Sequence, residues 1–243
     1  CTVEIGSSIG QSFKDWIKAS LDGKHVRKSG AIIAADFDYA ERSRREFREA
    51  LITEVGFPAL DAASKETAFL TVTFAPELIE RKAGSGQKLL AEKTKQKPWL
   101  KSNFRFEIKG LPTSKVNKID AFTIKQTMVT DGIGESRDQQ KEPGKLEFPN
   151  LAFTLAESDA QPWYDWFDDF VLRGNNGPDK EKTGVLEFVD PSRTDVLLAV
   201  EFRGLGIFKV ASDTSEAGEQ AIRRIKVELY CESLTVAFTG GSG

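Results

Sequence analysis

A serine flanked by glycines is the first candidate for chemistry in this chain. Residues 6–10 read Gly-Ser-Ser-Ile-Gly and match the G-x-S-x-G pattern, in which a serine at a strand-to-helix turn acts as a nucleophile. Such a serine needs a histidine base and an acid that orients it. His25 is the only histidine, and it follows the same expected helix. We interpret residues 6–10 as a glycine-rich turn, with a serine hydrolase centred on Ser8 as an open alternative.

Metal ligands are sparse in the sequence. One histidine and two distant cysteines, Cys1 and Cys231, do not form a zinc site by themselves. Asp165, Asp168 and Asp169 can supply oxygen ligands for Ca²⁺, but their spacing is better explained as the solvated face of a helix. Two cysteines cannot form a disulfide framework, which favours a reducing compartment. We therefore predict a protein that is not an enzyme, with no catalytic residues, no metal and no cofactor.

Aromatic side chains offer the other candidate site. Trp16, Trp163, Trp166 and Phe170 can line a sugar or lipid site, so a carbohydrate- or lipid-binding β-sandwich module is our alternative function. These residues also recur at helical spacing, on the face of a helix that must pack on a sheet. We favour a core role over a binding platform.

The elements that carry these residues occur twice. Residues 13–76 return in altered form as residues 163–231, and the offset grows only from 150 (166 minus 16) to 155 (227 minus 72). A repeat of this length indicates a duplicated domain. The matching segments are FKDWI with WYDWF, GAII with GVLE, REFREA with VEFRGL, and TAFLTVTF with IRRIKVEL.

Each repeat is expected to contain one amphipathic helix and several strands. Ser12 is a candidate cap for the first helix, which Gly23 ends, and Ser158 for the second, which Gly174 ends. Alternating or apolar runs predict the strands, which include 30–38, 43–55, 70–74, 104–108, 116–129, 184–189, 195–208 and 222–236. The predicted fold class is mainly β with one α-helix per repeat, as two tandem antiparallel β-sandwich or split-barrel domains.

Composition shifts predict the domain boundaries. We expect a first domain at 1–81, a lysine-rich linker at 82–100, a second domain at 101–239 and a linker-like tail at 240–243. The start at a cysteine and the Gly-Gly-Ser-Gly end suggest a trimmed, processed or engineered chain. The second domain has additional strand pattern at 102–150, so the first lacks its N-terminal strands and should have an open sheet edge.

Charge and hydropathy limit the partners. With 243 residues, 40% hydrophobic content and a net charge of -3, the chain can bury a core and has no large basic surface. We expect no specific nucleic acid binding. No apolar run is long enough to cross a bilayer, so we expect no membrane insertion.

A polar segment at 131–144 (DGIGESRDQQKEPG) lies between two strand patterns and predicts a long, exposed hairpin loop. Exposed loops and sheet edges are common sites of assembly. We therefore propose an assembly loop made of Asp131, Gly132, Gly134, Glu135, Arg137, Asp138, Lys141 and Glu142.

The first repeat resembles the tail tube proteins of contractile phage tails and bacterial contractile injection systems. The matching segments, in the family's order, are FKDWIKASLDGK, VRKSGAIIAADFD, REFREALITEVGFPALDAASKE and TAFLTVTFAPE. They cover most of residues 10–80. The second repeat keeps the helix and the strand order but has SEAGEQA in place of LDAASKE, so its resemblance is weaker.

This resemblance implies a structural subunit that joins strands with neighbouring copies around a central lumen. Single-domain members of the family form hexameric rings, so three copies of a duplicated chain can form a pseudo-hexamer, as in a hub or tube initiator. A ring of six copies of this chain is an open alternative. The implied partners are the chain itself and other tail, baseplate or sheath proteins. The implied location is a virion tail or injection-system particle that assembles in the cytoplasm.

Overall fold

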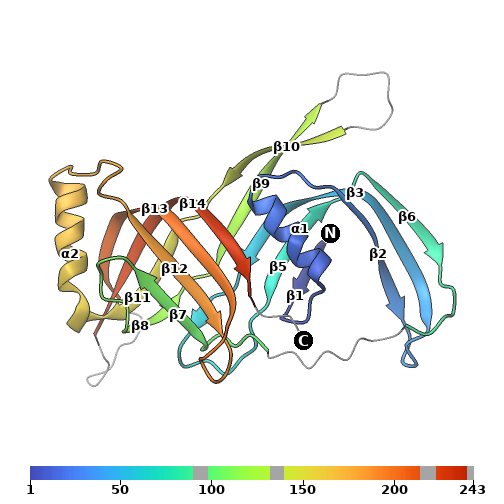
Figure 1. Cartoon of the computed structure of the whole chain (residues 1–243), viewed down its shortest axis with the longest axis horizontal. Coiled ribbons are helices and arrows are strands. Elements are labelled where there is room, and N and C mark those ends of the chain that lie inside the picture. The colour runs from blue at the N-terminus through green and yellow to red at the C-terminus, as the bar shows by residue number, and fades with distance from the viewer. Residues whose placement is uncertain (90–97, 132–139, 214–222, 240–243) are drawn as a thin grey trace.

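The computed structural model describes residues 1–89, 98–131, 140–213 and 223–239. In these ranges the chain forms two seven-stranded antiparallel sheets and two α-helices, with the sheets curling side by side (Figure 1). The predicted fold class, mainly β with one α-helix in each repeat, is confirmed. The first sheet contains β1 (Thr2–Ile5), β2 (Lys28–Ala35), β3 (Glu41–Phe57), β5 (Leu70–Ala75), β6 (Leu78–Ala83), β9 (Phe122–Asp131) and β10 (Gln140–Glu147).

The second sheet has one linear strand order, β4-β8-β11-β14-β13-β12-β7. Its strands are β4 (Leu60–Asp61), β7 (Phe104–Ile108), β8 (Val116–Ile119), β11 (Leu151–Ala156), β12 (Lys182–Val189), β13 (Val196–Asp213) and β14 (Arg224–Phe238). The helix α1 (Gln11–Leu21) lies against β3 and β14, and α2 (Gln161–Phe167) lies against β13. The helix α2 therefore covers a long strand of its own repeat, whereas α1 lies against β3 of its own repeat and also against β14 of the second repeat.

The two repeats pair their strands in the same register. In both copies an antiparallel pair, β2 with β3 or β12 with β13, sets a glycine opposite a phenylalanine. The next pairing also has the same register in both repeats: β3 pairs with β5 and β6 in the first, and β13 pairs with β14 in the second. The matched partners are Gly30–Phe47 and Gly184–Phe202, Ile52–Phe74 and Ile207–Leu229, Val55–Val72 and Val210–Val227, and Val3–Val72 and Phe153–Val227. The duplication inferred from sequence is thus a duplication of structure.

The irregular positions of the sheets also repeat. The register shifts at Thr53 in β3, between Ile52 and Glu54, and at its counterpart Phe208 in β13, between Ile207 and Lys209. A β-bulge bends and twists its strand, so shared bulges give the two sheets a similar curl. The strand β14 corresponds to β5 and β6 together, which are separated by residues 76 and 77 in the first sheet.

A buried or half-buried aspartate holds the same turn in each repeat. Asp36 Oδ1 accepts hydrogen bonds from the backbone N–H groups of residues 38 and 40, at 3.0 and 2.9 Å. Asp190 Oδ1 accepts from Thr194 N and Asp195 N at 2.9 and 3.0 Å. Tyr39 and Arg193, the corresponding third turn residues, have positive φ angles of 61° and 59°. Residues 190–193 therefore form a turn between β12 and β13, in which Arg193 N donates to Asp190 O at 2.8 Å.

The helix ends differ from the predicted caps. Gly10 caps α1 without a side-chain hydrogen bond, because glycine has no side chain, and its carbonyl accepts from the backbone N–H groups of residues 13 and 14. Ala160 caps α2, and Ser158 instead contacts Lys115 and Asp159. Both predicted serine caps are therefore wrong. A 3-10 turn (Glu157–Asp159) precedes α2, and a π-helical turn (Asp168–Leu172) follows it.

The glycines that end the helices fit the prediction. Gly23 and Gly174 follow the last helical turns with positive φ angles of 74° and 70°. Glycine adopts this left-handed conformation without the steric cost that a side chain adds.

One predicted strand, 116–129, is in fact two strands in different sheets. The strand β8 pairs with β11 in the second sheet, whereas β9 pairs with β3 in the first. The chain turns at Asp120, whose N–H donates to Ala152 O at 2.8 Å and whose carboxylate accepts from Lys226 Nζ at 2.6 Å. Hydrogen bonding at one residue thus redirects an otherwise continuous strand pattern.

This crossover ties the two repeats together. Residues 54–57 of β3 pair with residues 122–125 of β9, and β4 pairs with β8. The ring of Phe57 stacks on that of Phe122 with their centroids 4.7 Å apart. The predicted domain boundaries remain a proposal, and the two sheets divide the strands in another way.

All four tryptophans lie in the hydrophobic core. Trp16, Trp99, Trp163 and Trp166 are 3%, 2%, 0% and 8% exposed. Indole N–H groups in both repeats are hydrogen-bonded: Trp16 donates to Val26 O at 2.7 Å and Trp163 to Pro112 O at 3.1 Å. The prediction of a core role is confirmed. Among the described helices, neither has the length and apolar character to cross a membrane.

Candidate assembly surface

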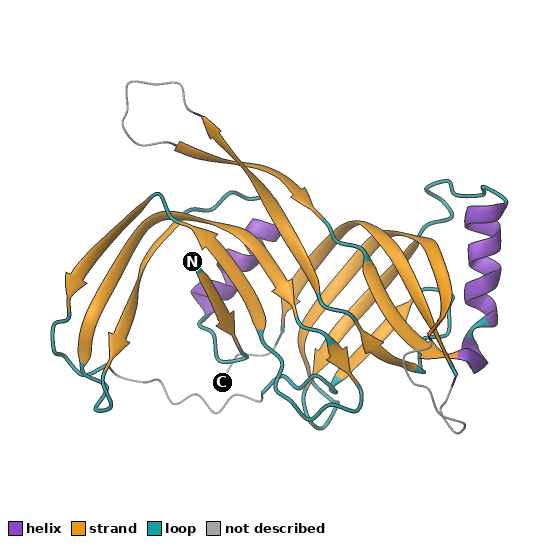
Figure 2. Ribbon diagram, turned by 180° about the vertical axis from the view of Figure 1, so that it is seen from behind, coloured by secondary structure: helices purple, strands orange, loops and turns teal. Residues whose placement is uncertain are grey.

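The β9–β10 hairpin projects from the body of the molecule (Figure 2). Its strands pair from Glu147–Lys125 at the base to Gln140–Asp131 at the far end. The register shifts between Pro143 and Leu146, which bends the hairpin. Its base is anchored because β9 also pairs with β3. The fold therefore anchors the base of this hairpin in the first sheet and lets its far end extend beyond the other strands.

The described members of the proposed assembly loop lie at the far end of this hairpin. Asp131 ends β9, and Lys141 and Glu142 belong to β10. Glu142 is exposed and pairs with Val129, which is 57% exposed. Gly132, Gly134, Glu135, Arg137 and Asp138 lie outside the described residues. The assignment of this loop to assembly stays a proposal.

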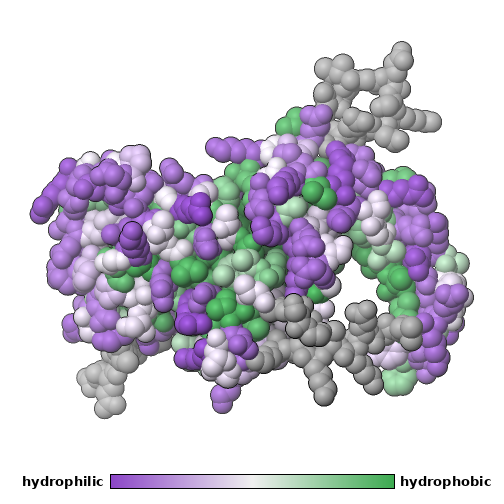
Figure 3. All heavy atoms as spheres, in the orientation of Figure 1, coloured by the Kyte–Doolittle hydropathy of each residue, from purple (hydrophilic) through white to green (hydrophobic). Residues whose placement is uncertain are grey.

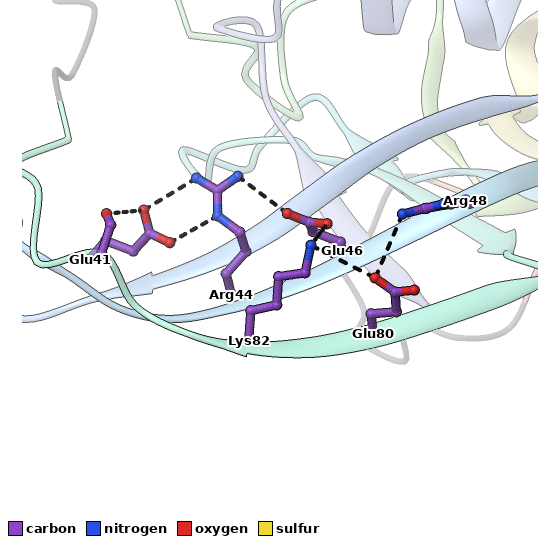
Figure 4. A network of polar contacts seen from close by, with 7 residues as sticks. Glu41, Arg44, Glu46, Arg48, Glu80 and Lys82 are labelled. Carbon is purple, nitrogen blue, oxygen red and sulfur yellow. Dashed lines mark hydrogen bonds and ion pairs between the residues drawn. The ribbon is translucent and has the colours of Figure 1, made fainter.

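Charged side chains form a ladder across β3 and β6 (Figure 4). Arg44 donates two hydrogen bonds to Glu41, from Nε at 2.8 Å and from Nη2 at 3.2 Å. Lys82 Nζ lies 2.5 Å from a carboxylate oxygen of Glu46 and 3.7 Å from one of Glu80, which also lies 3.7 Å from Arg48 Nη2. Alternating charges thus link the two strands on one face.

This ladder shifts the titration of its carboxylates. The hydrogen bonds from Arg44 lower the pKa of Glu41 below its ordinary value, with a further contribution from the Ser85 hydroxyl at 3.0 Å. The hydrogen bond from Lys82 lowers the pKa of Glu46 and raises that of Lys82. Both carboxylates are therefore held in their charged form.

Acid is expected to loosen β3 from β6. Because the folded pKa values of Glu41 and Glu46 are lowered, their stabilisation is present above the unfolded glutamate pKa of about 4.3. It is lost as the pH falls through the folded values. Amide hydrogen exchange in β6, measured from pH 6 down to pH 3 with correction for intrinsic rates, should show protection falling in this window. The variant Glu41→Gln/Glu46→Gln should show a smaller fall, and an equal fall in both proteins would contradict the role of the ladder.

Four strands of the first sheet have an edge without a partner among the described residues, and one of them, β10, pairs only with β9. β1 pairs only with β5, and β2 and β6 each pair only with β3. The second sheet covers the corresponding edges of β11 and β12 with β8 and β7. Exposed edges are templates for pairing with another chain. The first repeat therefore presents the open edges expected from its sequence.

The single histidine is held by a contact other than Ser8. His25 Nδ1 lies 3.0 Å from Gln126 Nε2, and no described hydrogen bond joins His25 to Ser8. Within the described ranges no group of three or more histidine, cysteine or acidic residues is placed to hold a metal. Asp165 accepts from Gln161 at 2.8 Å, and Asp169 accepts from Asn175 at 2.9 Å. Local hydrogen bonds thus account for both carboxylates.

Sequence patterns missed the charged ladder. Its members alternate along β3, at Arg44, Glu46 and Arg48, and along β6, at Glu80 and Lys82. The alternation is visible in the sequence. Its meaning depends on the Glu46–Glu80 register, which requires β6 to be recognised as a strand.

No protein-family model matches the chain, and no curated protein matches it. Among solved structures, the chain is similar to one from the sheath–tube complex of an extracellular contractile injection system in its extended state. That similarity has 15% identity and a TM-score of 0.43, and covers 56% of this chain and 89% of the other. A chain of the anti-feeding prophage cap, a tube-terminating cap, matches at 16% identity and a TM-score of 0.43, covering 61% and 97%.

Hcp1 from Flavobacterium johnsoniae is also similar, with 9% identity and a TM-score of 0.33, covering 56% of this chain and 95% of that one. Together with an anti-feeding prophage baseplate, these neighbours are tube, cap and baseplate components and Hcp1 proteins. Each match spans most of the neighbour and between half and two thirds of this chain.

Proposed function

We propose that this chain is a structural subunit of a phage-tail-like tube, or of a hub or tube-initiator ring, that assembles around a central lumen. Its function then lies in assembly with copies of itself and with other tail, baseplate or sheath proteins. Support comes from the ordered tube-protein motifs in residues 10–80. We also propose assembly in the cytoplasm into a virion tail or injection-system particle.

The observation that carries this proposal is the register-matched duplication. The two repeats share strand pairing, bulges and turns, so one chain presents two similar curved sheets. Three copies would present six such sheets, which is the number in a hexameric ring of single-domain subunits. When one surface patch binds a different patch on the next copy, the copies form a ring if the rotation closes and a helical filament if it does not.

The alternative of a carbohydrate- or lipid-binding module has no support from the tryptophans. All four indole rings are buried, whereas stacking on a ligand requires an exposed ring face. The largest exposed aromatic fraction belongs to Phe37, in the turn between β2 and β3. Turn residues of this kind suit contact with a neighbouring subunit.

Mass and shape in solution test the assembly proposal. Light scattering coupled to size-exclusion chromatography should give three copies per particle, and negative-stain images should show rings with six similar units. Six copies per ring would support the hexamer instead. A monomer that persists at the highest soluble concentration would contradict both.

Alanine variants test the assembly loop. The variant Glu135→Ala/Arg137→Ala/Asp138→Ala should reduce the ring fraction if the hairpin tip contacts a neighbour. The matched control is Glu201→Ala/Arg203→Ala, an exposed ion pair on β13 with a 3.8 Å separation, which should leave the rings intact. An equal loss of the ring fraction in both variants would contradict a special role of the hairpin. It would not contradict ring formation by the wild-type chain.

A further inference from the structure

A groove beside β2 lacks a strand that the second repeat contains. In the second sheet, β7 pairs antiparallel with β12 and places Phe104, Phe106 and Ile108 opposite Phe188, Leu186 and Gly184. The counterpart of β12 in the first repeat is β2. Among the described residues, β2 pairs with β3 alone. The molecule therefore contains both a filled and an open version of one site.

Corresponding side chains of the two repeats differ in their exposed fraction. Leu186 is 0% exposed beneath β7, whereas its counterpart Ile32 is 41% exposed. The ring of Phe106 packs edge-on against Phe153, with 5.0 Å between centroids, and both rings are buried. The counterpart of Phe153 is Val3, which is only partly buried. An apolar surface that the second repeat covers is left open in the first.

The open surface is a groove of about 420 Å³ between β1, α1 and β2. Figure 3 shows the molecule hollowed beside the arm formed by β2, β3 and β6, with hydrophobic residues on the wall. Gly30 leaves the ring of Phe47 accessible, because a Cβ atom there would lie 2.8 Å from Phe47 Cζ. The groove is lined mainly by Val3, Phe13, Trp16, Gly30, Ile32 and Phe47.

We propose that this groove binds an extended segment of a partner polypeptide, which adds a strand antiparallel to β2. Its alternate residues are large and apolar, in the pattern of Phe104, Phe106 and Ile108. Main-chain hydrogen bonds to the open edge of β2 supply affinity, and the apolar groove selects the side chains. The proposed occupant is a polypeptide of a different sequence, and β7 itself is not available for this role because it is already paired with β12.

The outward face of the bound strand gives a second specificity element. In the filled site, Arg105 of β7 forms an ion pair with Glu187 at 3.1 Å. The counterpart of Glu187 is Ile33, which has no charge to offer. The groove of the first repeat therefore selects apolar alternation without requiring a basic residue between the two aromatic positions.

A synthetic peptide that copies β7 tests the proposal. A fluorescein-labelled peptide of residues 102–110 (SNFRFEIKG) should bind the full chain saturably, as measured by fluorescence anisotropy. The same peptide with Phe106→Asp should bind at least about tenfold more weakly, because a carboxylate would enter an apolar groove. Absence of saturable binding, or equal binding of both peptides, would overturn the proposal.

Two adjacent residues of β2 provide matched protein variants. Ile32→Arg places a charge in the groove and should weaken peptide binding at least about tenfold. It should fold normally, because Ile32 is already 41% exposed, and circular dichroism checks this. Ile33→Glu restores the charge of Glu187 opposite the peptide's Arg105 and should retain or tighten binding. Unchanged binding by Ile32→Arg would overturn the proposed location.

Light scattering without peptide distinguishes the source of the occupant. If the wild-type chain associates with rising concentration and the Ile32→Arg variant does not, a second copy of this chain fills the groove. The assignment to a polypeptide of a different sequence is then wrong. If the association state is the same in both proteins and peptide binding differs, the partner assignment holds.

Discussion

Replacing Trp163 with alanine is expected to lower the free energy of unfolding by about 3 to 5 kcal/mol. The side chain is 0% exposed and packs edge-on against Phe153, with 5.2 Å between ring centroids. Its indole N–H donates to Pro112 O in a partly buried hydrogen bond, so truncation leaves both a cavity and a carbonyl without this donor. Chemical denaturation followed by circular dichroism measures the loss.

The first repeat supplies the control for this substitution. Phe13 is the counterpart of Trp163 and is only partly buried, so Phe13→Ala should cost clearly less. Trp163→Phe keeps an aromatic ring in the core and should also cost less than alanine. If Trp163→Ala and Phe13→Ala destabilised the chain equally, the two helices would not differ in burial as described.

Substituting Gly206 with leucine is expected to destabilise the second sheet by about 3 kcal/mol. The ring of Tyr230, on the neighbouring strand β14, lies over this glycine, and a Cβ atom at 206 would be 2.1 Å from Tyr230 Cζ. The corresponding pair in the first sheet is Leu51 with Ala75. In the second repeat the small residue is on β13 and the large one on β14, whereas in the first repeat the large residue is on β3 and the small one on β5.

Restoring the reversed order should rescue the substitution. In the double variant Gly206→Leu/Tyr230→Ala, the loss should be smaller than the sum of the single losses by about 1 to 3 kcal/mol. Tyr230→Phe removes only the hydroxyl that donates to Glu181 at 2.7 Å, and it should give no rescue. Additive losses in the double variant would show that the two positions do not share space.

The repeat made much of this fold predictable. Segments such as REFREA are ambiguous between helix and strand alone, but the copy VEFRGL indicated a strand, and β3 and β13 confirm it. The buried tryptophans followed from helical spacing. Both predictions depend on local periodicity, which the sequence displays directly.

Other features depend on long-range pairing, which a single sequence does not display. The segment 116–129 divides between two sheets next to Asp120, which donates a hydrogen bond to Ala152 and accepts one from Lys226. The predicted cap of α1 was wrong because the helix begins after Gly10, whose backbone carbonyl accepts the first helical hydrogen bonds. The sequence correctly predicted a hairpin near the proposed assembly loop. The contacts of the loop with other subunits are a prediction that the variants above test.

The matched registers of the two repeats create a hazard during synthesis. Adjacent domains with the same pairing pattern can exchange strands while both are still unfolded, which traps misassembled chains. The reversed size order at 51/75 and 206/230 opposes such an exchange. Pairing β3 with β14 would place Leu51 against Tyr230, and pairing β13 with β5 would leave Gly206 facing Ala75. One hybrid is overcrowded and the other contains a void, so divergence at these positions guards each half against its own duplicate.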